Sequence, residues 1–154
     1  ASACGNTQKI ANPGFESGTA SWTASSGVIG QNGPSEPAHS GTWNAWLNGF
    51  GATHTDTVSQ SVTIPAGCGS YQLSYWLHVD TGEFGDTPYD TLTVQVGSTT
   101  VGTYSNVDAA DGYQRHTVDL AQFAGQTVTV TFTGTEDTGL QTSFVLDDVT
   151  VDLT

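Results

Sequence analysis

Apolar residues alternate with threonine, serine and glutamine along most of this chain, and signals for helices are almost missing. Successive side chains of a β-strand point to opposite faces, so a period of two predicts strands with one buried and one hydrated face. Clusters of glycine, proline, asparagine and aspartate separate these segments, as expected for turns. The chain is therefore predicted to be all-β, a jelly-roll β-sandwich of about eight or nine antiparallel strands. The alternating segments are 58–64, 71–79, 91–96, 116–120, 128–132 and 144–151, and a single helical turn is expected at 121–125.

The length and charge of the chain limit its organisation and its partners. Its 154 residues suit one domain, which we expect to span 9–154 after a lead-in of residues 1–8, in a monomer. The sequence has 15 acidic and 2 basic residues, a formal net charge of −13. Nucleic acids and anionic membranes both attract lysine and arginine, so neither is expected as a partner. No run of about 18 apolar residues is present, which argues against a membrane-spanning helix.

The two cysteines, Cys4 and Cys68, both lie in glycine-containing turns. Neither has a second cysteine or a histidine at the spacing of a zinc or redox motif. We interpret them as one disulfide, which is typical of secreted proteins, with two free thiols as the alternative. The bond would close a long loop and hold the N-terminal segment, a stabilisation of roughly 4 kcal/mol in the chain-entropy description.

Carboxylates without counter-charges stand near both ends of the chain. Glu16 lies in the turn-rich run 12–18, and Asp147 and Asp148 interrupt a hydrophobic strand. Carboxylates that are wholly or partly buried need a cation, and Lys9 and Arg115 are the only lysine and arginine. Hard oxygen ligands favour calcium, so Ca²⁺ is the predicted cofactor. The alternative is that these are ordinary turn and strand-edge charges.

Acidic residues also gather in three other loops, where they are candidates for a second metal site. If these loops meet at one end of the sandwich, they could hold a second calcium, although none has the spacing of an EF-hand. A hydrated acidic rim is the alternative. The candidate ligands are Asp80, Glu83, Asp90, Glu136 and Asp137, with Asp56 and Asp86 in the same loops.

Aromatic side chains are the candidates for a sugar-binding surface, because pyranose rings expose apolar C–H faces while amides and carboxylates bind their hydroxyls. Strand alternation at 43–48 places Trp46 on the same face as Asn44 and Asn48, opposite Ala45 and Leu47. Trp46 is therefore the first choice for a ligand contact. The alternative is that the tryptophans fill the core or its ends. The candidate set is Trp43, Asn44, Trp46, Asn48, Trp76 and Tyr89, with Gln95 as a further hydroxyl partner.

Several runs of the sequence resemble known extracellular modules. The run 12–18 followed by Trp22, the His39-Ser40-Gly41 turn and the closing run 146–149 resemble jelly-roll carbohydrate-binding modules of the family 4, 9 and 22 type. The runs 45–51, 54–57, 74–79, 89–94 and 132–144 are similar to ancillary domains of secreted actinobacterial peptidases and other exported hydrolases.

This resemblance implies a structural calcium that joins the first strand, the His39 turn and the last strand. The side chains of Glu16 and of Asp147 or Asp148 would be ligands, completed by carbonyls near Gly14, His39 and Thr42. Imidazole is a poor calcium ligand, so His39 would contribute only its carbonyl.

No catalytic constellation is visible. His39, His54, His78 and His116 are scattered, and neither an HExxH motif nor a GxSxG elbow occurs. We expect a non-catalytic, calcium-stabilised, secreted module that targets a tethered hydrolase to a polysaccharide or another extracellular surface. The alternative is a structural, export-assisting or protein-binding domain of a secreted peptidase with no sugar affinity. Exposed aromatic side chains in a groove would favour the first function.

Overall fold

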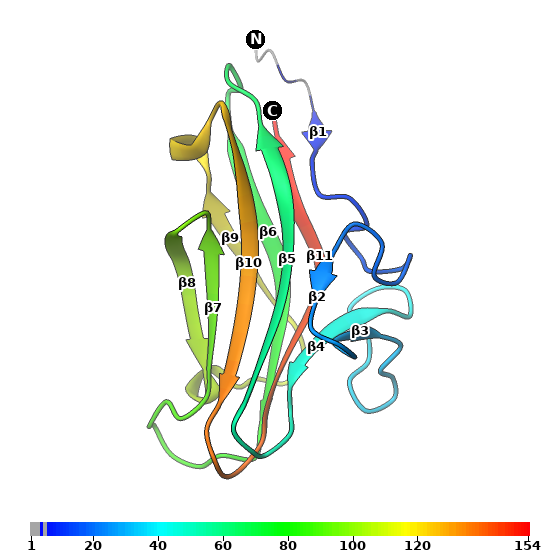
Figure 1. Ribbon diagram of the computed structural model, residues 1–154, viewed down its shortest axis with the longest axis vertical. Helices are drawn as coiled ribbons and strands as arrows, with labels where there is room; N and C mark the ends of the chain where they lie inside the picture. Colours follow the sequence, from blue (N-terminus) through cyan, green and yellow to red (C-terminus); the bar gives the residue numbers. More distant parts are fainter. Residues whose placement is uncertain (1–3, 5) are drawn as a thin grey trace.

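Two antiparallel sheets pack face to face in the computed structural model, which describes Cys4 and residues 6–154 (Figure 1). One sheet has the order β3-β4-β11-β6-β9, with β1 paired to β11, and the other has the order β2-β5-β10-β7-β8. This is the predicted jelly-roll β-sandwich. The strands of the described residues are β1 (Thr7–Gln8), β2 (Thr23–Ala24), β3 (Ile29–Gly30), β4 (Asn44–Asn48), β5 (His54–Ile64), β6 (Tyr71–Thr81), β7 (Thr91–Val96), β8 (Thr99–Ser105), β9 (Gln114–Asp119), β10 (Gln126–Glu136) and β11 (Thr142–Leu153).

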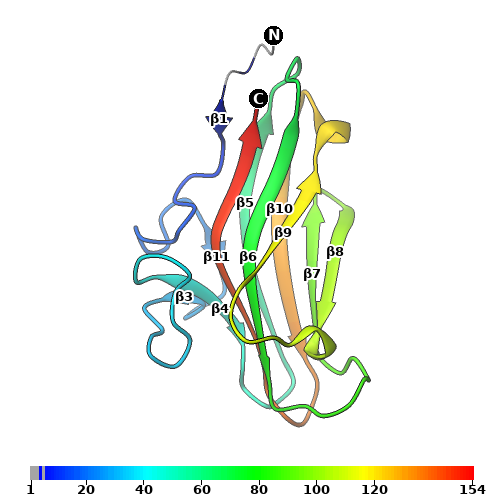
Figure 2. The ribbon, with the colours of Figure 1, turned by 180° about the vertical axis from the view of Figure 1, so that it is seen from behind.

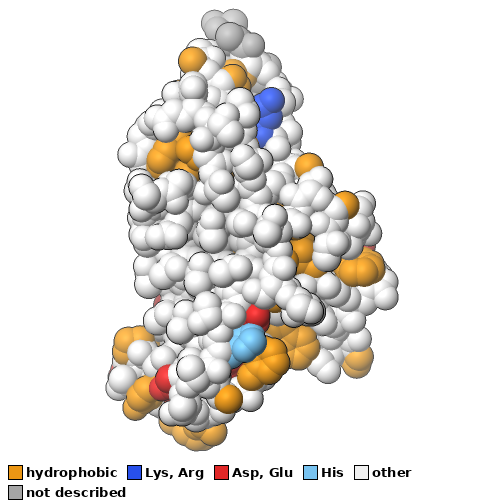
Figure 3. Space-filling view, in the orientation of Figure 1, with side chains coloured by type: hydrophobic (Ala, Val, Ile, Leu, Met, Phe, Trp, Pro, Cys, Tyr) orange, Lys and Arg blue, Asp and Glu red, His pale blue; other side chains and the backbone are white. Residues whose placement is uncertain are grey.

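The alternation in the sequence becomes an inner and an outer face on the long strands. In β5, Val58, Val62 and Ile64 are buried, while the threonines and serines between them lie on the outer face. β10 pairs with β5 so that Thr127 lies opposite Thr63 and Thr133 opposite Thr57. The middle of this outer face is accordingly free of charged side chains in Figure 3.

The hydrophobic core fills the space between the sheets. Tyr75 of β6 and Phe132 of β10 meet edge to face, with ring centroids 5.3 Å apart, and Phe144 and Leu146 of β11 are fully buried beside them. The Tyr75 hydroxyl shares a 2.7 Å hydrogen bond with that of Tyr104, which satisfies both polar tips. Burying each large side chain contributes about 1.5–3 kcal/mol, so this core is the main source of stability.

The predicted disulfide is confirmed: Cys4 is bonded to Cys68, with the Cα atoms 5.2 Å apart. It attaches the start of the chain to the loop between β5 and β6. Thr7 and Gln8, within the expected lead-in, pair with Leu153 and Asp152 of β11.

The only helical pieces of the described residues are two 3-10 turns, η1 (Asn106–Asp108) and η2 (Ala121–Phe123). The second coincides with the predicted single turn. No helix of the described residues is long and apolar enough to cross a membrane.

The two ends of the sandwich differ in character. β1 and the end of β11 lie at one end, with η2 (top of Figure 1). The segments 49–53, 82–90, 106–113 and 137–141 lie at the opposite end, which we call the loop end. Between the ends, the segment 31–43 folds across the outer side of β4 and β6, on the face turned to the viewer in Figure 2.

Candidate functional site

The turn between β1 and β2 brings Glu16 to the segment that precedes β4. The Glu16 carboxylate accepts hydrogen bonds from the backbone N–H groups of Thr42 at 3.1 Å and Trp43 at 3.0 Å. Gly41 has a φ of +65°, and a Cβ there would collide with this carboxylate. Glycine at 41 therefore permits both the backbone conformation and the close approach. Glu16 fastens the N-terminal turn to the 31–43 segment.

A bulge in β11 delivers Asp147 and Asp148 to the same region. The pairing of β11 with β6 changes register between Asp147 and Thr150, and Asp148 has a φ of +49°. In a regular strand two consecutive carboxylates would point to opposite faces, but here both contact one loop. Asp147 accepts the Ser40 amide at 3.1 Å, and Asp148 accepts the Ser40 hydroxyl at 2.7 Å.

The environment of these two aspartates is short of positive charge. Asp147 is fully buried, and this burial raises its pKa to about 7. The hydrogen bond from the Ser40 amide lowers the pKa in part, and the charge of Asp148 raises it further. Asp148 meets Nδ1 of His39 at 2.6 Å. The His39 ring is therefore a partner of Asp148.

The fold brings together the residues that the sequence predicts as calcium ligands: Gly14, Glu16, His39, Thr42, Asp147 and Asp148. A Cβ on Gly14 would lie 3.2 Å from Oδ1 of Asp148 and 3.9 Å from Oδ1 of Asp147. These groups offer carboxylate and carbonyl oxygens, the ligand type that calcium prefers, and no lysine or arginine of the described chain pairs with them. The Glu16 carboxylate is already held by amides, and among the described residues these three acids do not form a group with oxygens within 4.8 Å of one another.

A tighter acidic group lies at the loop end. Oxygens of Glu83, Asp90 and Asp137 all lie within 4.8 Å of one another and could hold a metal ion. Asp90 is completely buried and accepts hydrogen bonds from the Asp137 amide at 2.9 Å and the Thr142 hydroxyl at 2.6 Å. Burial and then Asp90 raise the pKa of both Glu83 and Asp137. We call these three residues the acidic triad.

The other acids of the predicted second site are placed differently. Glu136 is buried beside the triad, and its carboxylate accepts the Phe50 amide at 2.9 Å and the Gly51 amide at 3.1 Å. Asp80 lies apart, because it projects from the outer face of β6, where its side chain hydrogen-bonds Glu36. Asp56 is buried. Its carboxylate accepts a hydrogen bond from the backbone N–H of Asn48 at 2.8 Å and contacts Nε2 of His54 at 2.8 Å. Asp86 is exposed.

Trp46 lines a hollow of about 320 Å³ at the edge of the sandwich, together with Gly27, Asn32, Asn48, Gly49 and Phe50. The Trp46 indole is half-buried, and its Nε1 has no hydrogen-bond partner. The side-chain amide of Asn48 is also shielded, and neither its Nδ2 nor its Oδ1 has a hydrogen-bond partner. Phe50 is 62% exposed and packs against His54, with ring centroids 4.1 Å apart. We call this the aromatic hollow.

The remaining aromatic candidates do not join this hollow. Trp43 is half-buried near Gly18, and Trp76 stacks on His39 with ring centroids 4.0 Å apart, so one of its faces is covered. Tyr89 is 46% exposed in the 82–90 segment of the loop end. Gln95 projects from β7 of the other sheet and donates a 3.4 Å hydrogen bond to the Thr100 hydroxyl.

Asn44 is not available to a ligand. Alternation correctly places it on the outer face of β4, but the 31–43 segment covers it completely. Its Nδ2 donates to the Glu36 carbonyl at 2.8 Å, and its Oδ1 accepts from Asn32 at 2.8 Å.

The same segment builds a polar cluster that sequence patterns do not reveal. Glu36 is only 3% exposed and lies 3.3 Å from Nδ1 of His78. Burial, followed by the hydrogen bond and charge of Asp80, raises the pKa of Glu36 to about 8. Because the partners are more than 40 residues apart in the sequence, only the packing of the 31–43 segment on β6 brings them together.

Exposed hydrophobic side chains are concentrated at the loop end. Figure 3 shows hydrophobic surface at the lower end of the molecule, near acidic and histidine side chains. The large exposed hydrophobic residues of the described chain all belong to its segments: Phe50, Phe84, Tyr89, Val107 and Leu140. An open surface of this kind, rimmed by charge, is typical of interaction sites.

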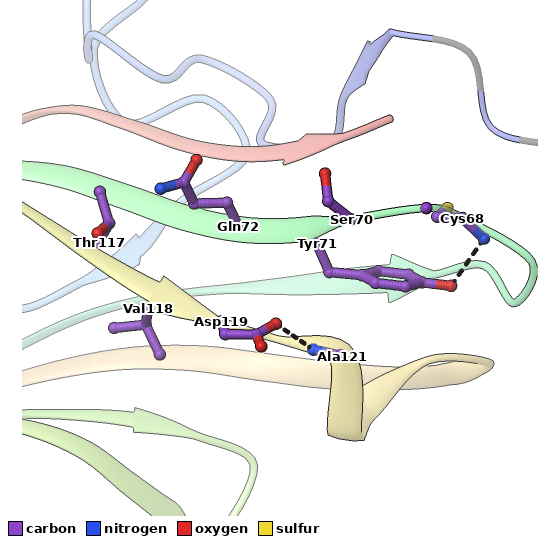
Figure 4. Close-up of a pocket in the computed structure, with 9 residues that line it drawn as sticks. Cys68, Ser70, Tyr71, Gln72, Thr117, Val118, Asp119 and Ala121 are labelled. Atoms are coloured by element: carbon purple, nitrogen blue, oxygen red, sulfur yellow. Dashed lines mark hydrogen bonds between the residues drawn. The ribbon is translucent and has the colours of Figure 1, made fainter. Parts of the chain in front are cut away.

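A further hollow, of about 480 Å³, lies at the opposite end beside the disulfide (Figure 4). Its polar groups serve the local turns: Asp119 accepts the Ala121 amide at 2.9 Å, and the Tyr71 hydroxyl accepts the Cys68 amide at 2.9 Å. No unpartnered buried polar atom of the described residues lines it.

The described residues form a jelly-roll β-sandwich, and the comparisons with known proteins concern this fold. No protein-family pattern matches the sequence, and no curated protein matches it significantly. Among solved structures, the carbohydrate-binding module TmCBM61 in complex with β-1,4-galactotriose is similar, with a TM-score of 0.64 and 21% identity, over 94% of this chain and 97% of that one.

Two other solved structures share the fold. The K3 cleaved adhesin domain of Lys-gingipain from Porphyromonas gingivalis W83 has a TM-score of 0.62 and 18% identity, over 96% of this chain and 99% of that one. A cyclase from Fischerella sp. TAU has a TM-score of 0.62 and 14% identity, over 97% of this chain and 98% of that one. At these identities the likeness establishes the fold and not the activity.

Proposed function

We propose that this protein is a non-catalytic carbohydrate-binding module and that the aromatic hollow is its glycan site. The observation that carries the proposal is that Trp46 and the exposed Phe50 line the same hollow. Trp46 and Phe50 offer faces on which a pyranose ring can stack.

The hollow is small and open, so we expect modest affinity for a chain end or a short stretch of glycan. Few apolar atoms are covered, and ordering a flexible polysaccharide is costly. Retention on a polysaccharide surface would then raise the local concentration of a tethered secreted hydrolase. The disulfide supports an oxidising, extracellular setting, and calcium bound between Asp147, Asp148 and nearby carbonyls would support the fold.

The experiment measures binding to insoluble polysaccharides and compares variants inside the aromatic hollow with a control variant outside it. We expect the wild-type protein to be retained by at least one insoluble polysaccharide from a panel of β-1,4-galactan, xylan, β-glucan, chitin and cellulose. The variants Trp46→Ala and Phe50→Ala should weaken that binding roughly tenfold or more, because each removes a stacking surface. Phe84→Ala removes an 83% exposed ring of the loop end that lies outside the hollow, and it should bind like wild type.

Two results would contradict this assignment. Equal losses in Phe50→Ala and Phe84→Ala would point to general surface stickiness. Absence of wild-type retention across the panel would favour the second candidate, a structural or protein-binding domain of a secreted peptidase. The exposed Phe84, Val107 and Leu140 at the loop end are the observation in favour of that candidate.

A further inference from the structure

We propose that the acidic triad of Glu83, Asp90 and Asp137 binds calcium and thereby fixes the loop that carries Phe50, so that the glycan site becomes calcium-dependent. This inference rests on the proposed function in one respect only, that the aromatic hollow binds the glycan. The metal site and its effect on the loop stand independently of it.

The triad offers oxygen ligands from three separate loop-end positions. Asp90 directly precedes β7, Glu83 lies seven residues earlier in the same 82–90 segment, and Asp137 directly follows β10. Calcium takes several carboxylate and carbonyl oxygens at about 2.3–2.6 Å, and oxygens already within 4.8 Å of one another can close around it with small movements.

A second observation points to a missing partner. Oδ1 of Asp137 is shielded from solvent and accepts no hydrogen bond from an amide or a hydroxyl, while burial and then the carboxyl group that it meets, that of Asp90, raise the pKa of Asp137. Oε1 of Glu83 lies on the same side of Gly139, because a Cβ on Gly139 would be 3.9 Å from Oδ1 of Asp137 and 4.0 Å from Oε1 of Glu83. A shielded carboxylate oxygen without a partner is unfavourable unless a proton or a cation binds it, and the hydrogen-bond donors found for the triad are neutral groups.

A short chain of contacts leads from the triad to Phe50. Glu136 directly precedes Asp137, and its buried carboxylate accepts the amides of Phe50 and Gly51. The same carboxylate accepts the Thr142 amide at 3.2 Å, while the Thr142 hydroxyl donates to Asp90 at 2.6 Å. A Cβ on Gly51 would lie 3.1 Å from the Gly139 carbonyl, so the 49–53 and 137–141 segments are packed together.

The expected coupling follows from these contacts. A cation that joins Asp137 to Asp90 holds the end of β10 in the position from which Glu136 fixes the Phe50 backbone. Binding of calcium and of glycan then favour the same arrangement, and by linkage each raises the affinity for the other by the same factor.

The first measurement needs no glycan. Chelator-treated protein is titrated with calcium chloride, and amide hydrogen exchange is followed at Phe50 and Gly51 with and without calcium. We expect the exchange of both amides to slow at least several-fold in calcium. Asp137→Asn should lose this slowing together with one equivalent of bound calcium. Asp86→Asn, which changes an exposed acid of the same 82–90 segment outside the triad, should retain both.

Further variants keep the test decisive. If Asp137→Asn does not fold, the partly exposed Glu83→Gln replaces it. Asp147→Asn should leave the slowing intact, because it lies at the other acidic site. If the triad variants bind as many calcium ions as wild type, the proposed metal site is wrong. If calcium does not slow amide exchange at Phe50 and Gly51 in wild type, the proposed coupling is wrong.

The second measurement is glycan affinity in calcium and in chelator. Wild type and Asp86→Asn should bind several-fold more tightly in calcium, whereas Asp137→Asn should bind equally weakly in both. Equal wild-type affinity in calcium and chelator overturns the regulation while leaving the glycan site in place. Failure of wild type to bind any glycan, with the exchange effect present, counts against the proposed function and leaves the triad site supported.

Discussion

At the scale of single residues, the main chemical feature of this protein is a set of buried carboxylates that have no lysine or arginine partner in the described chain. Glu36, Asp90, Glu136 and Asp147 are each at most 3% exposed, and their partners in the described chain are amides, hydroxyls, histidine or other acids. Burial disfavours the charged form of a carboxylate, so such groups gain either from a proton or from a bound cation. Calcium and pH should therefore both affect stability.

Glu36 gives the pH prediction. Its folded pKa of about 8 exceeds the ordinary value of 4.5, with His78 and Asp80 of β6 and the Tyr113 hydroxyl facing it. Between these values the folded state keeps a proton that the unfolded state loses. The contribution of Glu36 is therefore fully present below about pH 4.5 and is lost as pH rises through 8, by at most about 1.4 kcal/mol per pH unit.

The variant Glu36→Gln should remove this loss. Relative to wild type, its free energy of unfolding in urea should increase between pH 5 and pH 8. Asp111→Asn, an exposed acid of the 106–113 segment, is the control and should follow the wild-type pH dependence. A Glu36→Gln profile parallel to wild type would contradict a shared proton at this position.

At the scale of elements, the strands divide into those that local pattern predicts and those that need the fold. The six alternating segments correspond to β5, β6, β7, β9, β10 and β11. One face is buried and the other more exposed along β5, β7 and β10, whereas the first half of β11 is buried on both faces. β8 matches none of the predicted segments: its residues Thr99 and Thr100 are both exposed, and Gly102 interrupts its alternation. The two-residue strands β1, β2 and β3 carry too little pattern to be predicted.

The candidate sites divide in the same way. The sequence alone indicates the Asp147 region and the loop-end acids, because a carboxylate in an apolar strand or a cluster of acids without bases is informative by itself. The burial of Asn44 and the Glu36 cluster arise from the 31–43 segment, whose path depends on contacts with β4 and β6. Its sequence of glycine, proline and serine specifies a loop without specifying where the loop folds.

β11 carries the prediction for calcium at the bulge. If calcium binds at Asp147 and Asp148, free calcium at 100 times the dissociation constant adds about 2.7 kcal/mol, or roughly 5–10 °C in melting temperature. Asp147→Asn should show a smaller calcium-induced rise than wild type. Asp152→Asn, on the same strand with its carboxylate engaged by the Thr150 hydroxyl, should show the full rise. Equal rises in Asp147→Asn and Asp152→Asn would exclude a calcium ion bound by Asp147.

At the scale of the whole molecule, the two ends of the sandwich carry different groups. The disulfide, β1 and the end of β11 lie opposite the loop end (Figure 1). The loop end carries the acidic triad and the exposed hydrophobic residues, and the aromatic hollow lies at its margin, since Phe50 belongs to both. This arrangement suits a module that presents one end to an extended surface.

The most direct test of the glycan site is the nuclear magnetic resonance spectrum of the tryptophan indoles. The chain has 4 tryptophans, and their N–H groups differ in environment. Trp46 Nε1 has no partner, whereas Trp22 Nε1 donates to the Asn12 carbonyl at 2.8 Å and serves as an internal reference. The protein is titrated with soluble oligosaccharides derived from the polysaccharide that binds it. The Trp46 signal should shift until saturation, while that of Trp22 stays in place. An unmoved Trp46 signal in protein saturated with glycan would contradict the assignment.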